Sequence, residues 1–311
     1  VLMFMIFALP TSPYTAMITA VARWFNRKVG MAMGLLMVAG GLSGILTPVL
    51  TWLIINYGWR TAFTVVGTSL LLCILPCFAI KNHGPEHYGL LPDGKALGEK
   101  KALEEKSASQ RRTMEGEVKD FTLREVLKDR SYWLIAIAYS VYNLVNQAIV
   151  VHLIPHLISI GFEPGLAALG MSIVTLSSVA GRLVFGWLGD VFKKRYVYAL
   201  CFAFMLVGGF VFTNVSVSWA IFLALAIYGP GMGGTIVARY AIQREYYGRE
   251  HYGITGGFMG FIAAIPSYIG PVFAGLIFDV YGSYIPAFMP LILLLIIAMV
   301  LTVMTQPPKK H

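Results

Sequence analysis

A single arginine has the most distinctive chemistry in this sequence. Arg182 is the only charged residue between Glu163 and Asp190, and its neighbours are apolar, small or hydroxylated. A guanidinium group stays charged in proteins and presents a planar fork of N–H donors that matches a carboxylate. Arg182 is therefore the first candidate for binding an anion.

Arg182 belongs to a chain that is too apolar for a water-soluble protein. Of the 311 residues, 57% are hydrophobic and 13% are charged, whereas soluble domains carry about 25% charged residues. A helix needs about 20 apolar residues to cross a hydrocarbon core of about 30 Å. We expect an all-α membrane protein, because barrel strands would alternate over about 10 residues. Nine continuous runs meet the need: 1–22, 29–55, 60–80, 132–157, 166–189, 196–214, 217–240, 253–278 and 284–305.

The basic residues predict how these spans cross the bilayer. Lysine and arginine accumulate on the cytoplasmic side, and all but two of the 24 lie in one alternating set of span ends and loops. This orientation places His311 in the cytoplasm and Val1 outside, with the plasma membrane as the expected location. Topology thus explains the net charge of +9, and no nucleic-acid partner is required. The set includes two triplets, Lys193, Lys194 and Arg195, then Arg239, Arg244 and Arg249.

One long polar segment divides the spans unequally. Residues 81–131 mix eleven basic with ten acidic residues, so we expect a cytoplasmic linker there. It would separate a partial N-terminal bundle, 1–80, from a six-helix C-terminal bundle, 132–311. The chain starts inside an apolar run without an initiator methionine. If the parent has two equal halves, we expect three further spans before Val1 and twelve in all.

Several stretches resemble a family of membrane transporters. Residues 186–195 read G-W-L-G-D-V-F-K-K-R, which resembles the loop that recurs once per half in the major facilitator superfamily. Stretches within 23–48, 57–63 and 84–94 resemble the monocarboxylate porter and oxalate/formate antiporter branches. The resemblance covers the whole chain and implies that the nine spans are helices 4 to 12 of a twelve-helix fold.

The loop motif also has a physical rationale. Asp190 can pair with neighbouring basic residues and face a helix N-terminus, while Gly186 lets two helices approach closely. We expect a conformational latch rather than a substrate site. Its residues are Gly186, Asp190, Lys193, Lys194 and Arg195.

The depth of Arg182 favours a functional role. It lies eight residues before Asp190, about 12 Å of helix and close to mid-bilayer. An arginine there costs at least about 2.5 kcal/mol, so it should face an aqueous cavity or a partner. No carboxylate lies in the middle of the nine spans, and we interpret the substrate as the partner. The resemblance implies the same, because both branches carry a helix-8 arginine that engages the substrate carboxylate.

Two alternatives remain for Arg182. It could pair with an acid on helices 1 to 3, or its side chain could extend toward the inner membrane surface. Two positions also depart from the family pattern. Proton-coupled monocarboxylate transporters have an aspartate where this chain has Ser178, and oxalate antiporters have a helix-11 lysine where 253–278 has no basic residue. One visible cation favours a monoanion, and coupling to protons or to an exchanged anion stays open.

Other polar residues predict the lining of a cavity. Asn143 and Gln147 are four residues apart and share a helix face with Tyr139. His152 titrates near physiological pH, so it could follow proton coupling, although a histidine near a membrane end is more often interfacial. His152 and His156 have metal-ligand spacing but lack a third ligand, so we expect no metal site.

The resemblance implies two further lining residues. Tyr14 on helix 4 and Tyr228 on helix 10 fall where oxalate-transporter relatives use aromatic residues to wall the substrate pocket. Tyrosine can form such a wall and donate one hydrogen bond, but aromatic residues in a bundle also serve simple packing.

These observations predict a secondary transporter of small organic anions, of monocarboxylate type, working by alternating access. Efflux of drugs or other hydrophobic solutes is the alternative, favoured by a partial helix-5 motif at Gly40, Gly44 and Pro48. No constellation for an enzyme and no cofactor site is visible. A non-transporting sensor would need a folded signalling domain, and 81–131 is too short and polar to be one.

Overall fold

The described part of the chain is built from helices joined by short turns. A computed structural model describes residues 17–18, 21, 24–25, 29–42, 45–72, 121, 123–215, 217–248 and 251–308. Tyr14 and most of the predicted linker, 81–131, lie outside these residues. So do Gly44, in the partial helix-5 motif, and Arg249.

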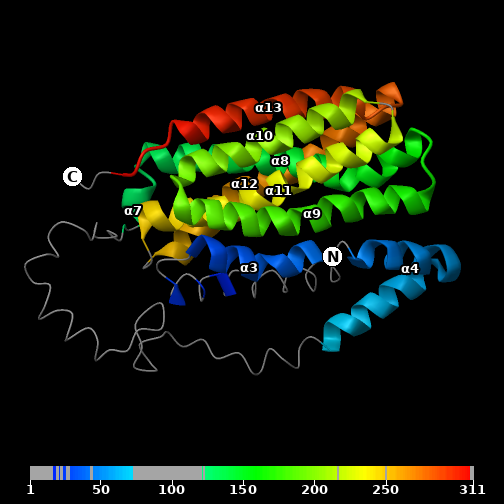
Figure 1. Cartoon of the computed structure of the whole chain (residues 1–311), viewed down its shortest axis with the longest axis horizontal. Helices are drawn as coiled ribbons and strands as arrows, with labels where there is room; N and C mark the ends of the chain where they lie inside the picture. The colour runs from blue at the N-terminus through cyan, green and yellow to red at the C-terminus, as the bar shows by residue number, and fades with distance from the viewer. Residues whose placement is uncertain are drawn as a thin grey trace, which may run out of the picture.

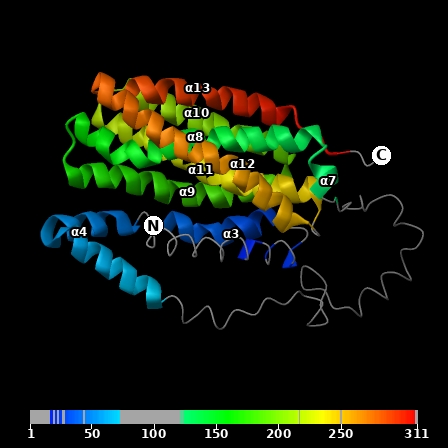
Figure 2. The ribbon, with the colours of Figure 1, turned by 180° about the vertical axis from the view of Figure 1, so that it is seen from behind.

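Six described helices are long and apolar enough to cross a membrane. Their bounds follow the predicted spans closely, since each apolar run needs a helix to satisfy its backbone within a bilayer. They run back and forth as one elongated bundle (Figures 1 and 2). The six are α8 (Arg130–Ser159), α9 (Pro164–Val191), α10 (Lys194–Asn214), α11 (Ser218–Tyr247), α12 (Tyr252–Tyr281) and α13 (Ile285–Val303). A four-residue helix, α7 (Leu123–Val126), precedes α8.

Two earlier helices lie against the bundle. They are α3 (Val29–Leu42) and α4 (Leu46–Leu72). The backbone of α4 leaves helical geometry at Gly58, where φ is 79° and ψ is 161°, a conformation open to glycine but costly for other residues. This break falls between the predicted spans 29–55 and 60–80, and α4 folds back there (Figure 1).

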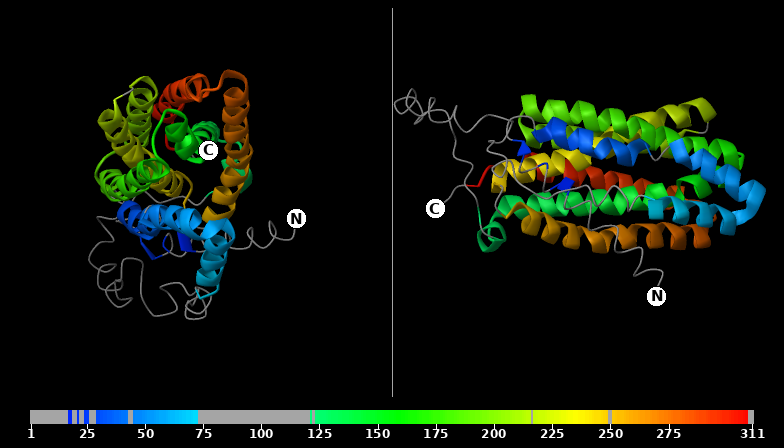
Figure 3. Two further views of the ribbon diagram at one scale, coloured as in Figure 1. Left: turned by 90° about the vertical axis from the view of Figure 1, so that its right-hand side faces the viewer. Right: turned by 90° about the horizontal axis from the view of Figure 1, so that it is seen from below.

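The C-terminal bundle is held by a defined set of helix pairs. α11 packs on α9 and α10, α12 packs on α8, and α13 packs on α8 and α10. The view along the helices shows α3 and α4 on one side of this bundle, with α3 beside α9 (Figure 3). The α3–α9 pair is therefore where the two parts of the chain meet.

One predicted boundary is wrong. The span expected at 217–240 is α11, which continues to Tyr247. Arg244, expected beyond the end of the span, lies inside this helix, and both it and Arg239, expected at the span end, are buried. The apolar run ends at Arg239, but the helix continues because its polar side chains find partners within the protein.

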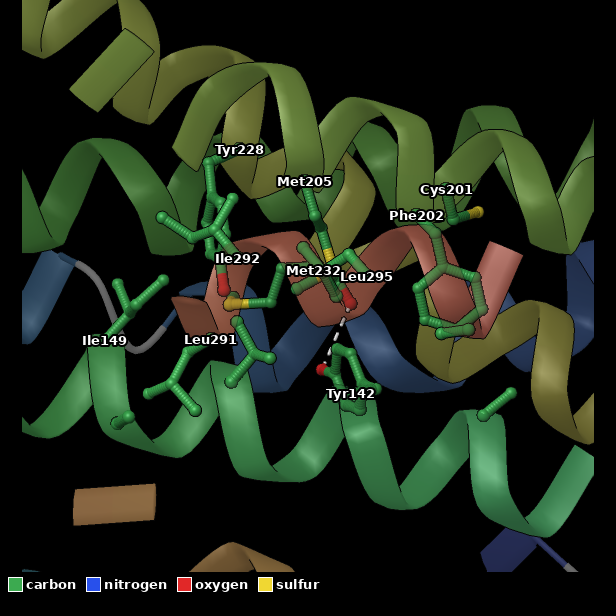
Figure 4. Packing of buried hydrophobic residues seen from close by; sticks show 14 of the residues in the cluster. Tyr142, Ile149, Cys201, Phe202, Met205, Tyr228, Met232, Leu291, Ile292 and Leu295 are labelled. Atoms are coloured by element: carbon green, nitrogen blue, oxygen red, sulfur yellow. Dashed lines mark hydrogen bonds between the residues drawn. The ribbon is translucent and has the colours of Figure 1, made fainter. Parts of the chain in front are cut away.

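Aromatic and sulfur-containing side chains fill the middle of the bundle. Tyr142 of α8 donates a hydrogen bond to the carbonyl oxygen of Met232 on α11, at 3.2 Å. Met205 of α10 and Leu295 of α13 pack beside this contact (Figure 4). This hydrogen bond joins α8 to α11 within a largely apolar core.

Small residues let α9 and α11 approach closely. A Cβ atom at Gly181 would overlap the backbone of Pro230, and one at Gly233 would overlap the backbone of Ser178. Close backbone approach of this kind is the usual way helices associate in membranes. The polar groups carried by α9 are therefore held at fixed depth relative to α11.

We predict that Gly181→Ala destabilises the protein although alanine favours helices. Its methyl group would force α9 away from Pro230, at a cost of about 1–3 kcal/mol for overpacking. Thermal unfolding in detergent would show a lower Tm. Gly189→Ala is the matched control on the same helix, because a Cβ there has no atom within 4 Å. Equal Tm values for the two variants would contradict the prediction.

Candidate functional site

Arg182 lies buried where α9 meets α3. Its side chain is 6% exposed, and its Nη1 donates a hydrogen bond to the carbonyl oxygen of Met37 on α3. A Cβ at Gly34 would overlap the backbone oxygen of Arg182, so the two backbones are nearly in contact. The guanidinium therefore bridges the two parts of the chain.

The Arg182 side chain does not extend toward the end of the bundle that carries Asp190. α3 and α9 run antiparallel, because Gly30 lies beside Gly186 while Gly34 lies beside Arg182. Met37 lies further along α3, away from the end of α9 that carries Asp190. The side chain reaches toward the middle of the bundle and is not turned out to lipid.

Asp190 caps α3. Its Oδ1 accepts a hydrogen bond from the backbone N–H of Gly30 at 2.9 Å, and its Oδ2 accepts one from Met31 at 3.0 Å. These are the first-turn N–H groups that a helix leaves unpaired, and the helix dipole favours a carboxylate there. Gly186 makes the geometry possible, since a Cβ there would lie 2.7 Å from the Gly30 oxygen.

The basic residues of the motif contact other partners. Lys194 forms an ion pair with Glu245 near the end of α11. Arg195 donates to the Thr305 carbonyl oxygen at 3.0 Å and stacks on Tyr196. Lys193 is exposed at the N-cap of α10. The expected pairing of Asp190 with its basic neighbours is thus absent from the described residues, and backbone N–H groups take its carboxylate oxygens instead.

The polar side chains of α8 differ in whether they contact other helices. Asn143 donates to the Tyr139 carbonyl oxygen within its own helix, at 2.8 Å, and Gln147 is half-buried. Tyr228 of α11 is fully buried. Its hydroxyl donates to Oδ1 of Asn146, at a long 3.5 Å. Asn146 was not singled out from the sequence, although it lies three residues after Asn143 and seven after Tyr139 and so shares their helix face.

Tyr142 is another residue that the sequence did not single out. Its hydroxyl donates to the Met232 carbonyl oxygen of α11. Its ring stacks on that of Tyr139, with the centroids 5.7 Å apart. Tyr142 therefore links the polar side of α8 to α11.

His152 contacts α12 and Tyr284 toward the end of the bundle that is opposite to Asp190. Its Nε2 lies 3.0 Å from the Pro271 carbonyl oxygen on α12, and its Nδ1 lies 3.3 Å from the Tyr284 hydroxyl. Both ring nitrogens are engaged by neutral groups, which fits an interfacial role. His156 is buried among Phe212, Tyr284 and Phe288. In the described part of the chain, no three His, Cys, Asp or Glu side chains could hold a metal.

We expected Arg182 to be the one charged residue inside the spans, but Arg239 is also buried. Arg239 is 1% exposed and lies eight residues before the end of α11. Its guanidinium carbon lies 4.7 Å from the Tyr139 ring centroid and 4.2 Å from that of Tyr240. Because Arg182 is not the only buried cation among the described residues, the number of cations does not favour a monoanionic substrate. Ala241 and Ile242 beyond Arg239 were too short a signal, before Gln243, Arg244 and Glu245, to show that α11 continues.

Comparisons with known proteins agree with this architecture. The family model of the Major Facilitator Superfamily matches residues 1–187 and 153–311. A crystal structure of the major facilitator transporter FucP in the outward conformation resembles the chain with a TM-score of 0.64 and 13% identity, over 94% of this chain and 72% of that one. At this identity the likeness concerns the fold.

Curated relatives carry transporter names. Monocarboxylate transporter 13 of Rattus norvegicus is 24% identical over 278 residues, covering 88% of this chain and 59% of the relative. Monocarboxylate transporter 12 of the same species is 26% identical over 302 residues, with 91% and 60% covered. The chain thus spans about three fifths of these relatives' length. Family and fold are those of transporters and not of enzymes, and the chain is an integral membrane protein that belongs to the major facilitator superfamily.

Proposed function

We propose that this chain is part of a secondary transporter of small organic anions, of monocarboxylate type. It would work by alternating access, with the substrate bound where the two parts of the chain meet. The observation that carries the proposal is the buried guanidinium of Arg182 at the crossing of α3 and α9. The names of the two similar monocarboxylate transporters agree with this substrate class.

The surroundings of Arg182 suit a carboxylate guest. The hydrogen bond to Met37 uses a neutral backbone oxygen, so this contact does not cancel the positive charge. A guanidinium has five N–H donors, and a carboxylate can take two of them at once. Tyr228, Asn143, Gln147, His152 and Tyr14 stay predicted lining residues.

Asp190 would hold one conformation of the transport cycle. The two hydrogen bonds from Gly30 and Met31 tie α9 to α3 at one end of the bundle. By the distribution of basic residues this end faces the cytoplasm, and the C-terminus lies on the same side, with the plasma membrane as the proposed location. Separation of α3 from α9 would break these bonds when the substrate path opens inward.

The coupling mechanism is constrained at one position. The Ser178 hydroxyl is fully buried and donates to the Thr175 carbonyl oxygen at 2.6 Å. A serine side chain has no carboxylate, so residue 178 cannot exchange a proton with the substrate as an aspartate could. We therefore propose that protons, if they are coupled, use another group, and that an exchanged anion is the other possibility.

The first prediction concerns Arg182→Lys. Lysine keeps the charge but loses the planar fork, so carboxylate uptake into proteoliposomes should fall at least roughly tenfold, the equivalent of one charge-assisted hydrogen bond. Arg130→Lys, at the exposed start of α8, is the matched control and should transport normally. Normal uptake by Arg182→Lys would overturn the proposed role.

A competition assay separates organic-anion transport from drug efflux. Lactate and pyruvate should compete with each other for uptake, because both present a carboxylate to the same guanidinium. Lipophilic cations should not compete, since a buried arginine repels them. Competition by the cations without competition by the acids would favour the efflux alternative.

The second variant is Asp190→Asn. It removes the charge that caps α3, worth up to about 2 kcal/mol at a partly buried helix terminus. The inward-open population should therefore rise by roughly tenfold or more. A Met33→Cys reporter on α3, buried in the present conformation, should be alkylated faster by a water-soluble maleimide.

Glu163→Gln is the control for Asp190→Asn. It removes a carboxylate that is exposed at the opposite end of α9. The Met33→Cys reporter in the Glu163→Gln variant should be alkylated at the same rate as in the protein that carries Met33→Cys alone. If Asp190→Asn also leaves the alkylation rate unchanged, the capping carboxylate does not act as a latch.

A further inference from the structure

A cavity of about 180 Å³ lies beside Arg239, between α8, α11 and α12. Its walls include the rings of Tyr139, Tyr240 and Tyr252, four glycines of α12 between residues 253 and 260, and Ile18. Ile18 comes from the N-terminal part of the chain, so this cavity also lies where the two parts meet. The described residues that line it include no acidic side chain.

Among the described residues, only neutral groups contact the Arg239 guanidinium. Its Nη2 donates to the Gly256 carbonyl oxygen at 2.9 Å, and its Nε donates to Sδ of Met259 at 3.4 Å. The rings of Tyr139 and Tyr240 lie within cation–π distance. Cation–π contacts reduce the cost of burial but leave the positive charge in place.

The cavity has the size of a small anion. At about 30 Å³ for each water molecule, its volume corresponds to roughly six waters, enough for a carboxylate with a few carbon atoms. The glycines of α12 keep the space open. A Cβ at Gly257 or Gly260 would have no atom within 4 Å, so larger side chains at these positions would enter free space.

The cavity is displaced along the bundle from Arg182. α9 and α11 start at the same end, where Glu163 and Ser218 line one pocket. Gly233 packs on Ser178, and Arg239 lies further beyond this contact than Arg182 does. Arg239 is thus nearer the end of the bundle that carries Asp190.

We propose that Arg239, with Tyr139 and Tyr240, forms a second binding site for small monocarboxylate anions. The identity of the anion rests on the proposed function, whereas the charge and size of the site rest on the cavity itself. The substrate would pass from Arg182 to Arg239 as it approaches the inner side. The site would also retain the anion while Asp190 keeps that side closed.

The test uses lactate as the probe and the thermal unfolding of the purified chain in detergent as the readout. Sodium lactate is titrated against sodium gluconate, a larger carboxylate of the same charge. Lactate should raise the Tm of the parent protein, and gluconate should not. The Arg182→Met variant should retain part of the lactate effect, because the second site remains intact.

Two changes in the Arg182→Met background probe the second site. Arg239→Met removes the charge, and Gly257→Leu fills the cavity while the charge remains. Each should abolish the residual effect or raise the half-saturating lactate concentration by roughly tenfold or more, the loss expected for a charge-assisted contact. Arg239→Lys serves if Arg239→Met fails to fold, and it should weaken lactate binding several-fold. Arg130→Met is the control and should leave the lactate response unchanged.

The outcomes separate the two proposals. If Arg182→Met alone abolishes the lactate effect, or Gly257→Leu and Arg239→Lys leave the half-saturating concentration unchanged, the second site is overturned and Arg239 is structural. A parent protein that shows no lactate effect also overturns it. If lactate stabilisation depends on Arg239 but proteoliposomes show no carboxylate uptake, the second site stands and the proposed transport function fails.

Discussion

Burial of permanent positive charge is the constraint on which this structure depends. An arginine deep in a membrane protein costs at least about 2.5 kcal/mol, and the described residues include three buried arginines, Arg182, Arg239 and Arg244. Backbone carbonyl oxygens and tyrosine rings surround them. A hydrogen bond from a charged donor contributes about 1.5–3 kcal/mol, which is enough to offset the cost without neutralising the charge. The positive charge of each guanidinium group therefore persists inside the protein.

Close packing of glycines and helix capping by Asp190 explain the contact between the two parts of the chain. Glycines let α3 and α9 approach so closely that side chains are excluded between them, and Asp190 then meets the unpaired N–H groups of α3. An exposed ion pair is worth little because water screens it, but a carboxylate on a helix terminus gains from both hydrogen bonds and the dipole. Asp190 thus ties α9 to α3 through two hydrogen bonds to backbone N–H groups.

Hydropathy and charge were enough to predict the fold. The six C-terminal spans agree with α8 to α13 because a bilayer imposes length and internal hydrogen bonding on every segment that crosses it. The predicted boundary of α11 was wrong because it depends on a contact between distant residues. A window of apolar residues ends at Arg239, and no neighbouring residue in the sequence shows that the ring of Tyr139 on α8 will stabilise its charge.

By itself, the sequence determined the membrane class, the order of the spans and the motif around Asp190. These follow from local composition, spacing and resemblance, which do not depend on how helices are arranged. The tertiary structure alone decided that Arg182 contacts Met37, that Asp190 caps α3, that His152 joins α12, and that Arg239 lines a cavity. Each of these depends on which helices meet and at what register, and that is set by close packing between residues far apart in the chain.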